Sequence, residues 1–433
     1  MEFKNIVLIL VIIFGIFLLN SIKLFKYNRQ YNILFILIAI CTQFSVKINF
    51  ITTQMYYYKV EYFYISTIFI ILLSIYIYNF KIFKPRLSLE NIFFICIFIN
   101  MIMSYSYLQI DDKVKFFSIG ILYITIYLIY SICRSIKIVN ITQILNWFSY
   151  FSIINGLLSI LQYITNKQLT LNNFNGSILY TEGIEITKRS IGFAISNNAA
   201  GNLSAILFAI VLYNFLLNKN KVNFLALVLN IIFSILTLTR IGYLAIVIEI
   251  IIVFSMTRWN SIKLIFNKIV IIMSAIIAGI VVYITIFNKI INVLFGQRGD
   301  TGSYRFLQFD RVLEYLGDKI GLFYGIGAGQ YKWQISNIFN QNEIDLHSQY
   351  INILCDHGWI IFILFTIFNI CIIVKALRDT NNLERSFIMS LAIGNFICIN
   401  FNPNQFYYVN NVVYFLIIFI WIYHKKYLAS NLT

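Results

Sequence analysis

The side chains best suited to chemistry lie in three polar stretches that adjoin long apolar runs. The first stretch, residues 189–201, begins with Arg189 and leads into an apolar run. Its Asn197 and Asn198 suit the N-terminus of a helix, where side-chain oxygens accept hydrogen bonds from free backbone donors. The favoured interpretation of these two asparagines is therefore a helix cap.

The second stretch, residues 236–245, separates two apolar runs with almost no loop. Arg240 must therefore lie at or within a membrane boundary, where a charge is costly and is more often functional or paired than incidental. The structural alternative is an arginine that reaches out to the lipid headgroups. We favour function, because a solitary arginine on this side runs against the charge bias of the loops.

The third stretch, residues 303–358, contains Arg305 and His347. Positions 347, 351, 354 and 358 recur on one face of a helix, so we expect His347 to begin that face and Asp345 to cap the helix. A helix N-terminus favours neutral imidazole, which is the form that a general base needs. The alternative is a loop histidine without a chemical task. His357 has no such context and is interpreted as structural.

Glycines 325, 327 and 329 weakly resemble a phosphate-binding loop. No preceding strand, Lys-Ser/Thr ending or acidic partner accompanies them, so the pattern does not predict a nucleotide site. No histidines and carboxylates have metal-ligand spacing, apart from an unconvincing Asp356 and His357 pair. We therefore expect no catalytic metal and no cofactor.

The elements that position these residues are membrane-spanning helices. Of the 433 residues, 60% are hydrophobic and 12% are charged, which no soluble fold accommodates. The apolar runs have the length of membrane helices, and the two prolines and the long unbroken runs disfavour a barrel. The predicted fold is an all-α polytopic membrane protein with thirteen spans, or twelve if the weak segment near 31–60 is miscounted. The runs are 5–21, 31–46, 60–79, 89–105, 115–132, 141–164, 197–217, 222–238, 241–256, 264–287, 358–376, 386–402 and 406–423.

The net charge of +16 follows the loops. Taking the loops alternately, one set holds 18 of the 33 basic residues and three acids, a net of 18 − 3 = +15. The other set holds 15 basic and 13 acidic residues, a net of +2, and Glu249 lies within a helix. Basic short loops stay in the cytoplasm, so the first set is predicted to lie inside. The charge thus indicates anionic lipid as a partner and excludes nucleic acid.

This topology divides the chain into four parts. We expect N-terminal helices over 1–164, central helices with a first outer loop over 165–287, a large extracytoplasmic loop over 288–357, and C-terminal helices over 358–433. The large loop is predicted to be partly helical.

Together the three stretches resemble the O-antigen ligase and O-antigen polymerase family of bacterial membrane glycosyltransferases. Gly192-Phe-Ala-Ile-Ser-Asn-Asn198 is similar to the family's G-x-F-x-N-x-N pattern, with Ser196 where asparagine is commoner. Thr239-Arg240-Ile-Gly242 is similar to its Thr/Ser-Arg-Gly pattern, with one residue inserted. An arginine, a G-x-G-x-G and an H-[NS]-x-x-L helix start follow at Arg305, Gly325 and His347, with Ile351 in place of the first leucine. The resemblance covers roughly residues 185–376.

The resemblance implies a GT-C-like fold and metal-independent transfer of a glycan from a polyprenyl diphosphate, on the outer face of the bacterial inner membrane. It implies that Arg240 and Arg305, with Arg189 as a third cation, bind the diphosphate and that His347 activates the acceptor hydroxyl. Arginine forks suit phosphate oxygens, and the attacking hydroxyl must lose a proton. The expected positioning residues are Asn198, Gly325, Gly327 and Gly358.

Three functions remain open. A polymerase joins repeat units of a surface polysaccharide. It is favoured because fifteen residues separate Arg305 from Gly321, a spacing that resembles the arginine-glycine loop pattern of the polymerases. A ligase transfers the finished polymer to lipid A core or another acceptor. A flippase would place ionisable residues mid-membrane between related halves, whereas here Glu249 is nearly alone there. The expected partners are the lipid-linked glycan, an acceptor glycan or glycolipid, membrane lipids and a chain-length regulator.

Overall fold

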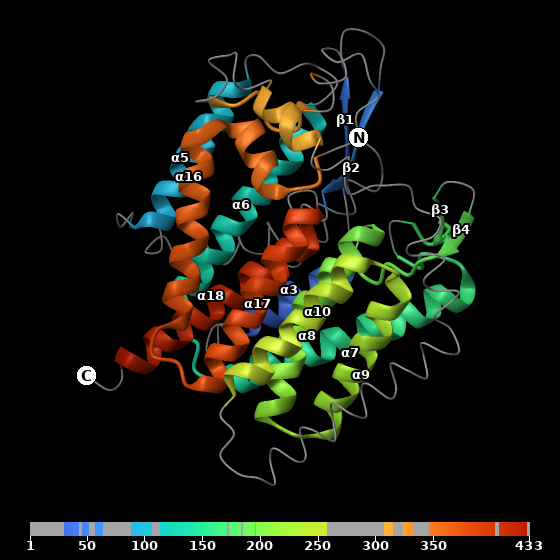
Figure 1. Cartoon of the computed structure of the whole chain (residues 1–433), viewed down its shortest axis with the longest axis vertical. Coiled ribbons are helices and arrows are strands. Elements are labelled where there is room, and N and C mark those ends of the chain that lie inside the picture. The colour runs from blue at the N-terminus through green and yellow to red at the C-terminus, as the bar shows by residue number, and fades with distance from the viewer. Residues whose placement is uncertain are drawn as a thin grey trace, which may run out of the picture.

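The computed structural model is mostly helical (Figure 1). It describes residues 30–42, 46–51, 57–63, 88–105, 113–170, 173–182, 185–194, 196–257, 307–314, 324–331, 334, 346–402 and 407–430. The predicted spans at 5–21 and 264–287, and Arg305, lie outside these residues. The helices are α3 (Tyr31–Thr42), α5 (Leu89–Ser104), α6 (Lys113–Ser135), α7 (Ile141–Thr165), α8 (Asn197–Leu217), α9 (Lys221–Thr237), α10 (Arg240–Met256), α16 (Gln349–Leu377), α17 (Asn382–Phe401) and α18 (Tyr408–Ser430).

Most of these helices coincide with the predicted apolar runs. Five of them, α6, α7, α8, α16 and α18, are long and apolar enough to cross a membrane, and α5 and α9 are shorter apolar helices. The chain is therefore a multi-pass membrane protein, as its composition predicts. An apolar helix of this length satisfies its own backbone hydrogen bonds in lipid, which is why such runs fold as helices.

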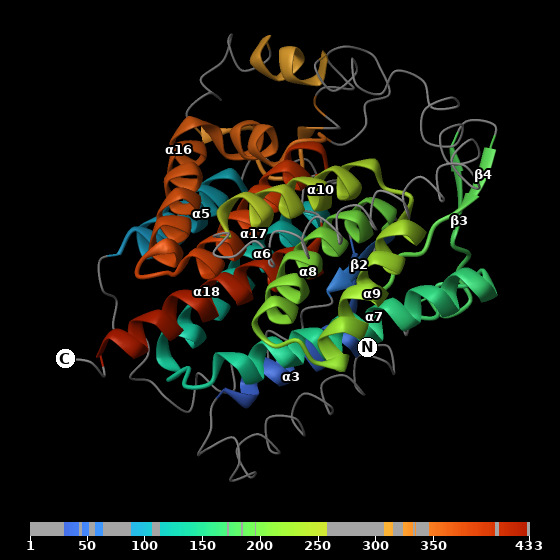
Figure 2. The ribbon, with the colours of Figure 1, turned by 60° about the horizontal axis from the view of Figure 1, so that its bottom comes forward.

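Two antiparallel hairpins depart from a purely helical chain. The first pairs β1 (Val46–Ile51) with β2 (Tyr57–Phe63). The predicted span at 31–46 therefore ends as a helix at Thr42, and the span predicted at 60–79 is wrong at its start, where β2 lies, while residues 64–79 lie outside the described residues. The second pairs β3 (Leu179–Glu182) with β4 (Glu185–Lys188) and lies beyond the end of α7 (Figures 1 and 2). Its tyrosine, threonine and isoleucine residues favour strands, a preference that hydropathy alone does not detect.

Helix α16 begins at Gln349, earlier than the apolar run predicted at 358–376. Its first turns carry polar residues that are buried within protein, among them Asn352, Asp356 and His357. Hydropathy does not predict this part of the helix because it is surrounded by protein and not by lipid, so its residues need not be apolar. Gly358 interrupts the helix with φ 77° and ψ 179°, a conformation that glycine adopts without a Cβ penalty.

The helices form two groups with α17 between them. Helices α5, α6, α16 and α18 make one group, and α7, α8, α9 and α10 make the other (Figures 1 and 2). Helices α8 and α10 approach closely at Gly201 and Gly242, where a Cβ on Gly242 would lie 2.7 Å from the carbonyl oxygen of Gly201. Such contacts between small residues allow membrane helices to pack backbone against backbone.

Where the structure describes them, the two predicted sets of loops lie at opposite ends of this bundle. At one end, Lys375 of α16 pairs with Glu90 of α5, and Lys425 of α18 pairs with Glu384 of α17. We name this the basic end, and the sequence predicts that it faces the cytoplasm. The other end holds the starts of α8, α10 and α16, and with them the described motif residues.

Candidate active site

The segment that leads into α8 is fixed by polar side chains from α7. Gln162 Oε1 accepts hydrogen bonds from the backbone of Ile191 and Gly192 at 3.0 and 2.8 Å, and Asn155 Oδ1 accepts one from Phe193 at 2.8 Å. Gly192 has φ +55°, and a Cβ there would lie 2.3 Å from Asn155 Oδ1. Gln162 and Asn155 were missed from the sequence, although buried amides within an apolar run are the signal that marks them.

The cap of α8 is Ser196 and not an asparagine. Its side chain accepts a hydrogen bond from the backbone of Ala199 at 3.3 Å, so the expectation that Asn197 and Asn198 cap the helix is wrong. Serine is an equally good cap and stands one residue earlier. The two asparagines instead line a cavity of about 440 Å³, together with Tyr407 and residues of the β3 region.

Arg189 lies just before this segment and is buried, with 3% of its surface exposed. Its guanidinium lies over the ring of Tyr180, 4.7 Å from the ring centre. The next residue, Ser190, donates its backbone N–H to the carbonyl of Leu236 at 3.0 Å and its hydroxyl to the carbonyl of Ser159 at 2.8 Å. The first motif is thereby attached to the end of α9, close to the second motif.

Arg240 is half-buried and is the first residue of α10, after the cap residue Thr239. The Thr239 hydroxyl donates a hydrogen bond to the carbonyl of Asn197 at 3.0 Å. Two residues after Arg240, Gly242 contacts Gly201 of α8. The structure therefore brings the start of α10 and the start of α8 together, and a helix N-terminus favours an anion at this point.

His347 is half-buried and precedes α16, whose cap is Ser348. The expectation that His347 begins a helical face is wrong, because the serine hydroxyl accepts from the backbone of Ile351 and the helix starts at Gln349. Asp345, the expected cap, lies outside the described residues. His347 Nδ1 lies 3.3 Å from Gln308 Oε1, a distance at which an N–H of the ring donates to the amide oxygen. That arrangement leaves the lone pair on Nε2.

The end of α17 connects His347 with the other two motifs. Ser348 donates its hydroxyl to Asn400 Oδ1 at 3.2 Å. Two residues later, the Asn402 carbonyl accepts from Asn202 of α8 at 2.8 Å, and the Asn402 amide donates to Asn202 Oδ1 at 3.3 Å. The sequence marks Asn202 and Asn402 only as amides within apolar runs and does not indicate that they pair, because they lie 200 residues apart.

The segment with Gly325 and Gly327 packs against the kink in α16. Because Gly358 breaks the helix, the carbonyls of Cys355 and Asp356 accept hydrogen bonds from Ile326 and Gly327 at 2.9 and 3.0 Å. Gly325 has φ +75°, and a Cβ there would lie 2.3 Å from the carbonyl oxygen of Asp356. The backbone N–H groups of Ile326 and Gly327 therefore bind carbonyl groups at the kink of α16 and not a phosphate.

Asn100 of α5 holds the same junction from the other side. Its amide donates to the carbonyls of Tyr324 and His357 at 2.9 and 3.2 Å, and its Oδ1 lies 2.7 Å from His357 Nδ1. His357 is 1% exposed. In the described part of the chain, no three or more histidine, cysteine or acidic residues gather as metal ligands would, and the expectation of no catalytic metal stays a prediction.

The order of these elements agrees with one known family. Residues 225–366 match the O-antigen ligase family. This part of the chain is thus an O-antigen ligase family domain, of the glycosyltransferase-like ligase and polymerase type, as the motifs indicated. No curated protein matches the chain.

The family match includes Arg240, Arg305, His347 and the segment with Gly325 and Gly327, and it ends within α16 after Gly358. It begins after Arg189 and Asn198, which lie in the segment before α8. The hydrogen bonds from Ser190 to Leu236 and from Thr239 to Asn197 join that segment to the matched domain.

Proposed function

We propose that the protein is a surface-polysaccharide polymerase that transfers a glycan from a polyprenyl diphosphate to a sugar hydroxyl, at the outer face of the bacterial inner membrane. The observation that carries the proposal is the connection of Arg240 and His347 through the starts of α8 and α16 and the end of α17. These groups lie at the end of the bundle opposite the basic end. The predicted topology assigns that end to the outer membrane surface, which a lipid-borne donor and an aqueous acceptor can both reach.

The chemistry divides between a base and cations. As the acceptor oxygen attacks the anomeric carbon, its proton passes to His347 Nε2, and the bond from that carbon to the phosphate oxygen breaks. The electron pair leaves with the polyprenyl diphosphate. Arg240 and Arg305, with Arg189 as a third cation, are proposed to bind the diphosphate, because fixed cations stabilise the charge that develops on the leaving group.

Gln308 is proposed as a positioning residue. By accepting the Nδ1–H of His347, its amide oxygen fixes the tautomer and the ring orientation. The Gln308→Leu protein should lose activity by about fivefold, the value of one ordinary hydrogen bond. A pH profile that changes shape in this variant distinguishes a tautomer effect from a loss of folded protein.

The test is a deletion strain complemented with His347→Ala, Arg240→Ala or Arg305→Ala proteins expressed at normal levels. We expect no long chains from any of the three, while Lys219→Ala, which removes an exposed lysine from the turn between α8 and α9, should restore the full ladder. Full-length polysaccharide from all three site variants would overturn the proposal.

The deletion strain also separates the two reactions within the family. Loss of long chains with one repeat unit remaining indicates the polymerase. The family description favours the ligase as the second candidate, and intact lipid-linked polymer that lacks its final attachment would identify it. The separation of Arg305 and Gly321 in the sequence supports the polymerase.

A further inference from the structure

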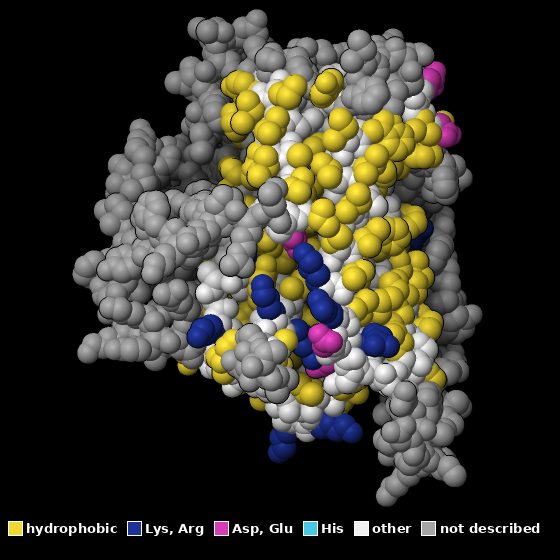
Figure 3. Space-filling model, turned by 90° about the vertical axis from the view of Figure 1, so that its left-hand side faces the viewer, with side chains coloured by type: hydrophobic (Ala, Val, Ile, Leu, Met, Phe, Trp, Pro, Cys, Tyr) yellow, Lys and Arg dark blue, Asp and Glu magenta, His cyan; other side chains and the backbone are white. Residues whose placement is uncertain are grey.

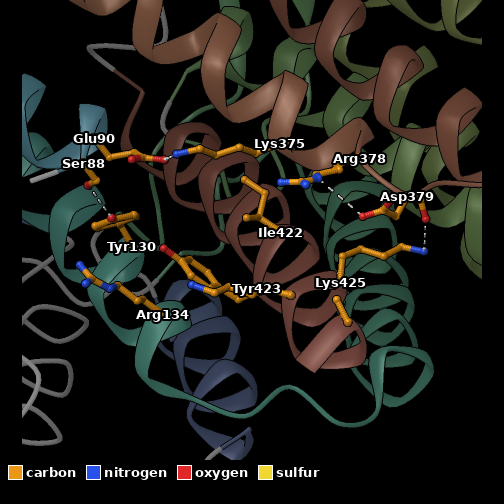
Figure 4. A pocket seen from close by; sticks show the side chains of 12 residues that line it. Ser88, Glu90, Tyr130, Arg134, Lys375, Arg378, Asp379, Ile422, Tyr423 and Lys425 are labelled. Carbon is orange, nitrogen blue, oxygen red and sulfur yellow. Dashed lines mark hydrogen bonds and ion pairs between the residues drawn. The ribbon is translucent and has the colours of Figure 1, made fainter. Parts of the chain in front are cut away.

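A cavity of about 530 Å³ lies at the basic end (Figure 4). It adjoins the end of α16, whereas His347 precedes the start of that helix. Four parts of the chain line the cavity: the start of α5, the end of α6, the end of α16 with the residues that follow, and the end of α18. Its volume is within the usual range of small-molecule sites. Nothing in the proposed transfer reaction uses it.

The charged lining of the cavity is mainly cationic. It contains five basic side chains and two carboxylates, and Glu384, which pairs with Lys425, adds a third acid nearby, for a net of 5 − 3 = +2. The basic side chains are Arg134, Lys375, Arg378, Lys425 and Lys426. Figure 3 shows the dark blue side chains gathered on one face of the protein.

Among the residues that the structure describes, two of these five cations, Arg134 and Lys426, take part in no ion pair. Lys375 pairs with the buried Glu90, and Arg378 Nε lies 3.7 Å from Asp379 in a pair that is largely exposed and therefore weak. The charge of Arg134 and Lys426 is therefore available to a ligand.

The cavity also offers hydroxyl groups and aromatic faces. Ser88 Oγ and the Tyr130 hydroxyl lie 3.2 Å apart, and the rings of Tyr130 and Tyr423 lie with centres 6.2 Å apart. Figure 4 shows these side chains around the same space as Arg134 and Lys375. Arginine, lysine and hydroxyl donors around one space are the chemistry that binds phosphate oxygens.

An apolar surface borders the cavity on the side of the membrane. Exposed side chains on α5 include Ile95 and Ile99, and those on α16 include Ile370 and Val374, each at least half exposed. Val374 directly precedes Lys375 of the cavity. In Figure 3 the apolar surface extends directly above the basic side chains. A molecule with an anionic head and hydrocarbon tails fits both surfaces together.

Membrane topology by itself explains basic residues in these loops, but it does not require them to line a cavity from four separate parts of the chain. We propose that this cavity binds a phosphate group, and that the adjoining apolar surface favours one carried by an anionic membrane lipid of the same leaflet. Basic pockets between helices on this side of a membrane recognise such headgroups.

The test uses the full-length protein and two matched pairs of substitutions. Arg134→Gln with Lys426→Gln removes the two cations without an ion pair, and Lys219→Gln with Lys221→Gln removes two exposed cations from the α8–α9 turn at the same end. Binding of phosphatidylglycerol and of phosphatidylcholine is measured by native mass spectrometry. Protection against thermal unfolding is measured with each lipid and with inorganic phosphate.

We expect phosphatidylglycerol to bind wild type in preference to phosphatidylcholine. One basic residue beside an anionic lipid contributes about fivefold, so the cavity pair should weaken binding by about 25-fold while the control pair keeps it. Protection by inorganic phosphate alone, lost in the cavity pair, supports the phosphate site and assigns its source to a soluble phosphate. Equal loss in both pairs, or no preference for any phosphate-bearing probe, overturns the proposal.

The wild-type protein gives a second test that does not depend on the folding of a variant. An amine-reactive label is applied with and without phosphatidylglycerol, and peptides are compared by mass spectrometry. Labelling of Lys426 should fall when the lipid is present, while labelling of the exposed Lys219 should not change. If phosphatidylglycerol leaves the labelling of Lys426 unchanged, as it does that of Lys219, the proposed site is contradicted.

Discussion

Substitution of Gly325 by alanine tests whether the junction with α16 holds the region of His347. The added Cβ would lie 2.3 Å from the Asp356 carbonyl oxygen and 2.4 Å from the His357 nitrogen, both backbone atoms that cannot turn aside. The φ of +75° adds strain of about 1 to 3 kcal/mol for a residue with a side chain. If the clash moves the Gly325 segment away from α16, the hydrogen bonds from Ile326 and Gly327 to the kink are also lost. Each contributes about 0.5 to 1.5 kcal/mol.

These terms sum to about 2 to 6 kcal/mol of local stability. The lower value corresponds to about a 30-fold increase in the population of the opened junction. Cys355 reports this opening, because it is fully buried in a small core with Ile326 and Leu346. Thiol labelling followed by peptide mass spectrometry should therefore show much faster modification of Cys355 in Gly325→Ala, with buried Cys133 unchanged as an internal reference.

Gly120→Ala is the matched control. Its Cβ would meet only the flexible end of Met101 at 3.1 Å within a regular helix, so labelling of Cys355 should stay at the wild-type rate. We also expect Gly325→Ala to shorten the polysaccharide ladder, because α16 starts next to His347. Normal Cys355 labelling together with a normal ladder in Gly325→Ala would refute the reasoning.

Three further predictions concern packing and charge, each measured by thermal unfolding of the purified protein in detergent. Gly242→Ala should destabilise by about 1 to 3 kcal/mol, since its Cβ meets the backbone of Gly201, and an unchanged unfolding temperature would contradict the close helix contact. Lys375→Met should destabilise by about 1 to 3 kcal/mol because the buried Glu90 loses its partner while Lys375 itself is 45% exposed, and adding Glu90→Gln should recover most of the loss. Glu249→Met should unfold at or above the wild-type temperature, because the buried carboxyl finds no hydrogen-bond partner in the described part of the chain, and a clear decrease would show that it has one.

The sequence predicts the helices well where they are surrounded by lipid. The ends of α8 and α9 agree with the apolar runs at 197–217 and 222–238, because hydropathy and length are the signals that lipid imposes. Prediction fails where a helix is surrounded by protein. The first turns of α16 are polar and buried, so its start at Gln349 was missed.

The site was predictable in its parts but not in its connections. The type and placement of Arg240 and His347 suggest their chemistry without any structure. Their relation depends on Thr239, Ser348 and the Asn202 and Asn402 bridge, which join segments up to about 200 residues apart. Residues that act only by such contacts have no periodic or local signature in a single sequence.

The choice of caps shows the same limit on a small scale. Serine and asparagine are nearly equal as caps, so local preference does not decide between Ser196 and Asn197. The bonds that hold Ile191, Gly192 and Phe193 to α7 fix where the chain turns, and Ser196 then stands at the first free donors of α8. The tertiary contacts therefore decide which polar residue becomes the cap.

The most direct test of the account is polymerisation by purified protein in vesicles that contain a polyprenyl diphosphate-linked repeat unit. The account predicts that wild type forms polymer and that His347→Gln, with unchanged thermal stability, forms it at least about 100-fold more slowly, the usual contribution of a general base. Polymer formation by His347→Gln at the wild-type rate would contradict the assignment of His347, and with it the proposed mechanism.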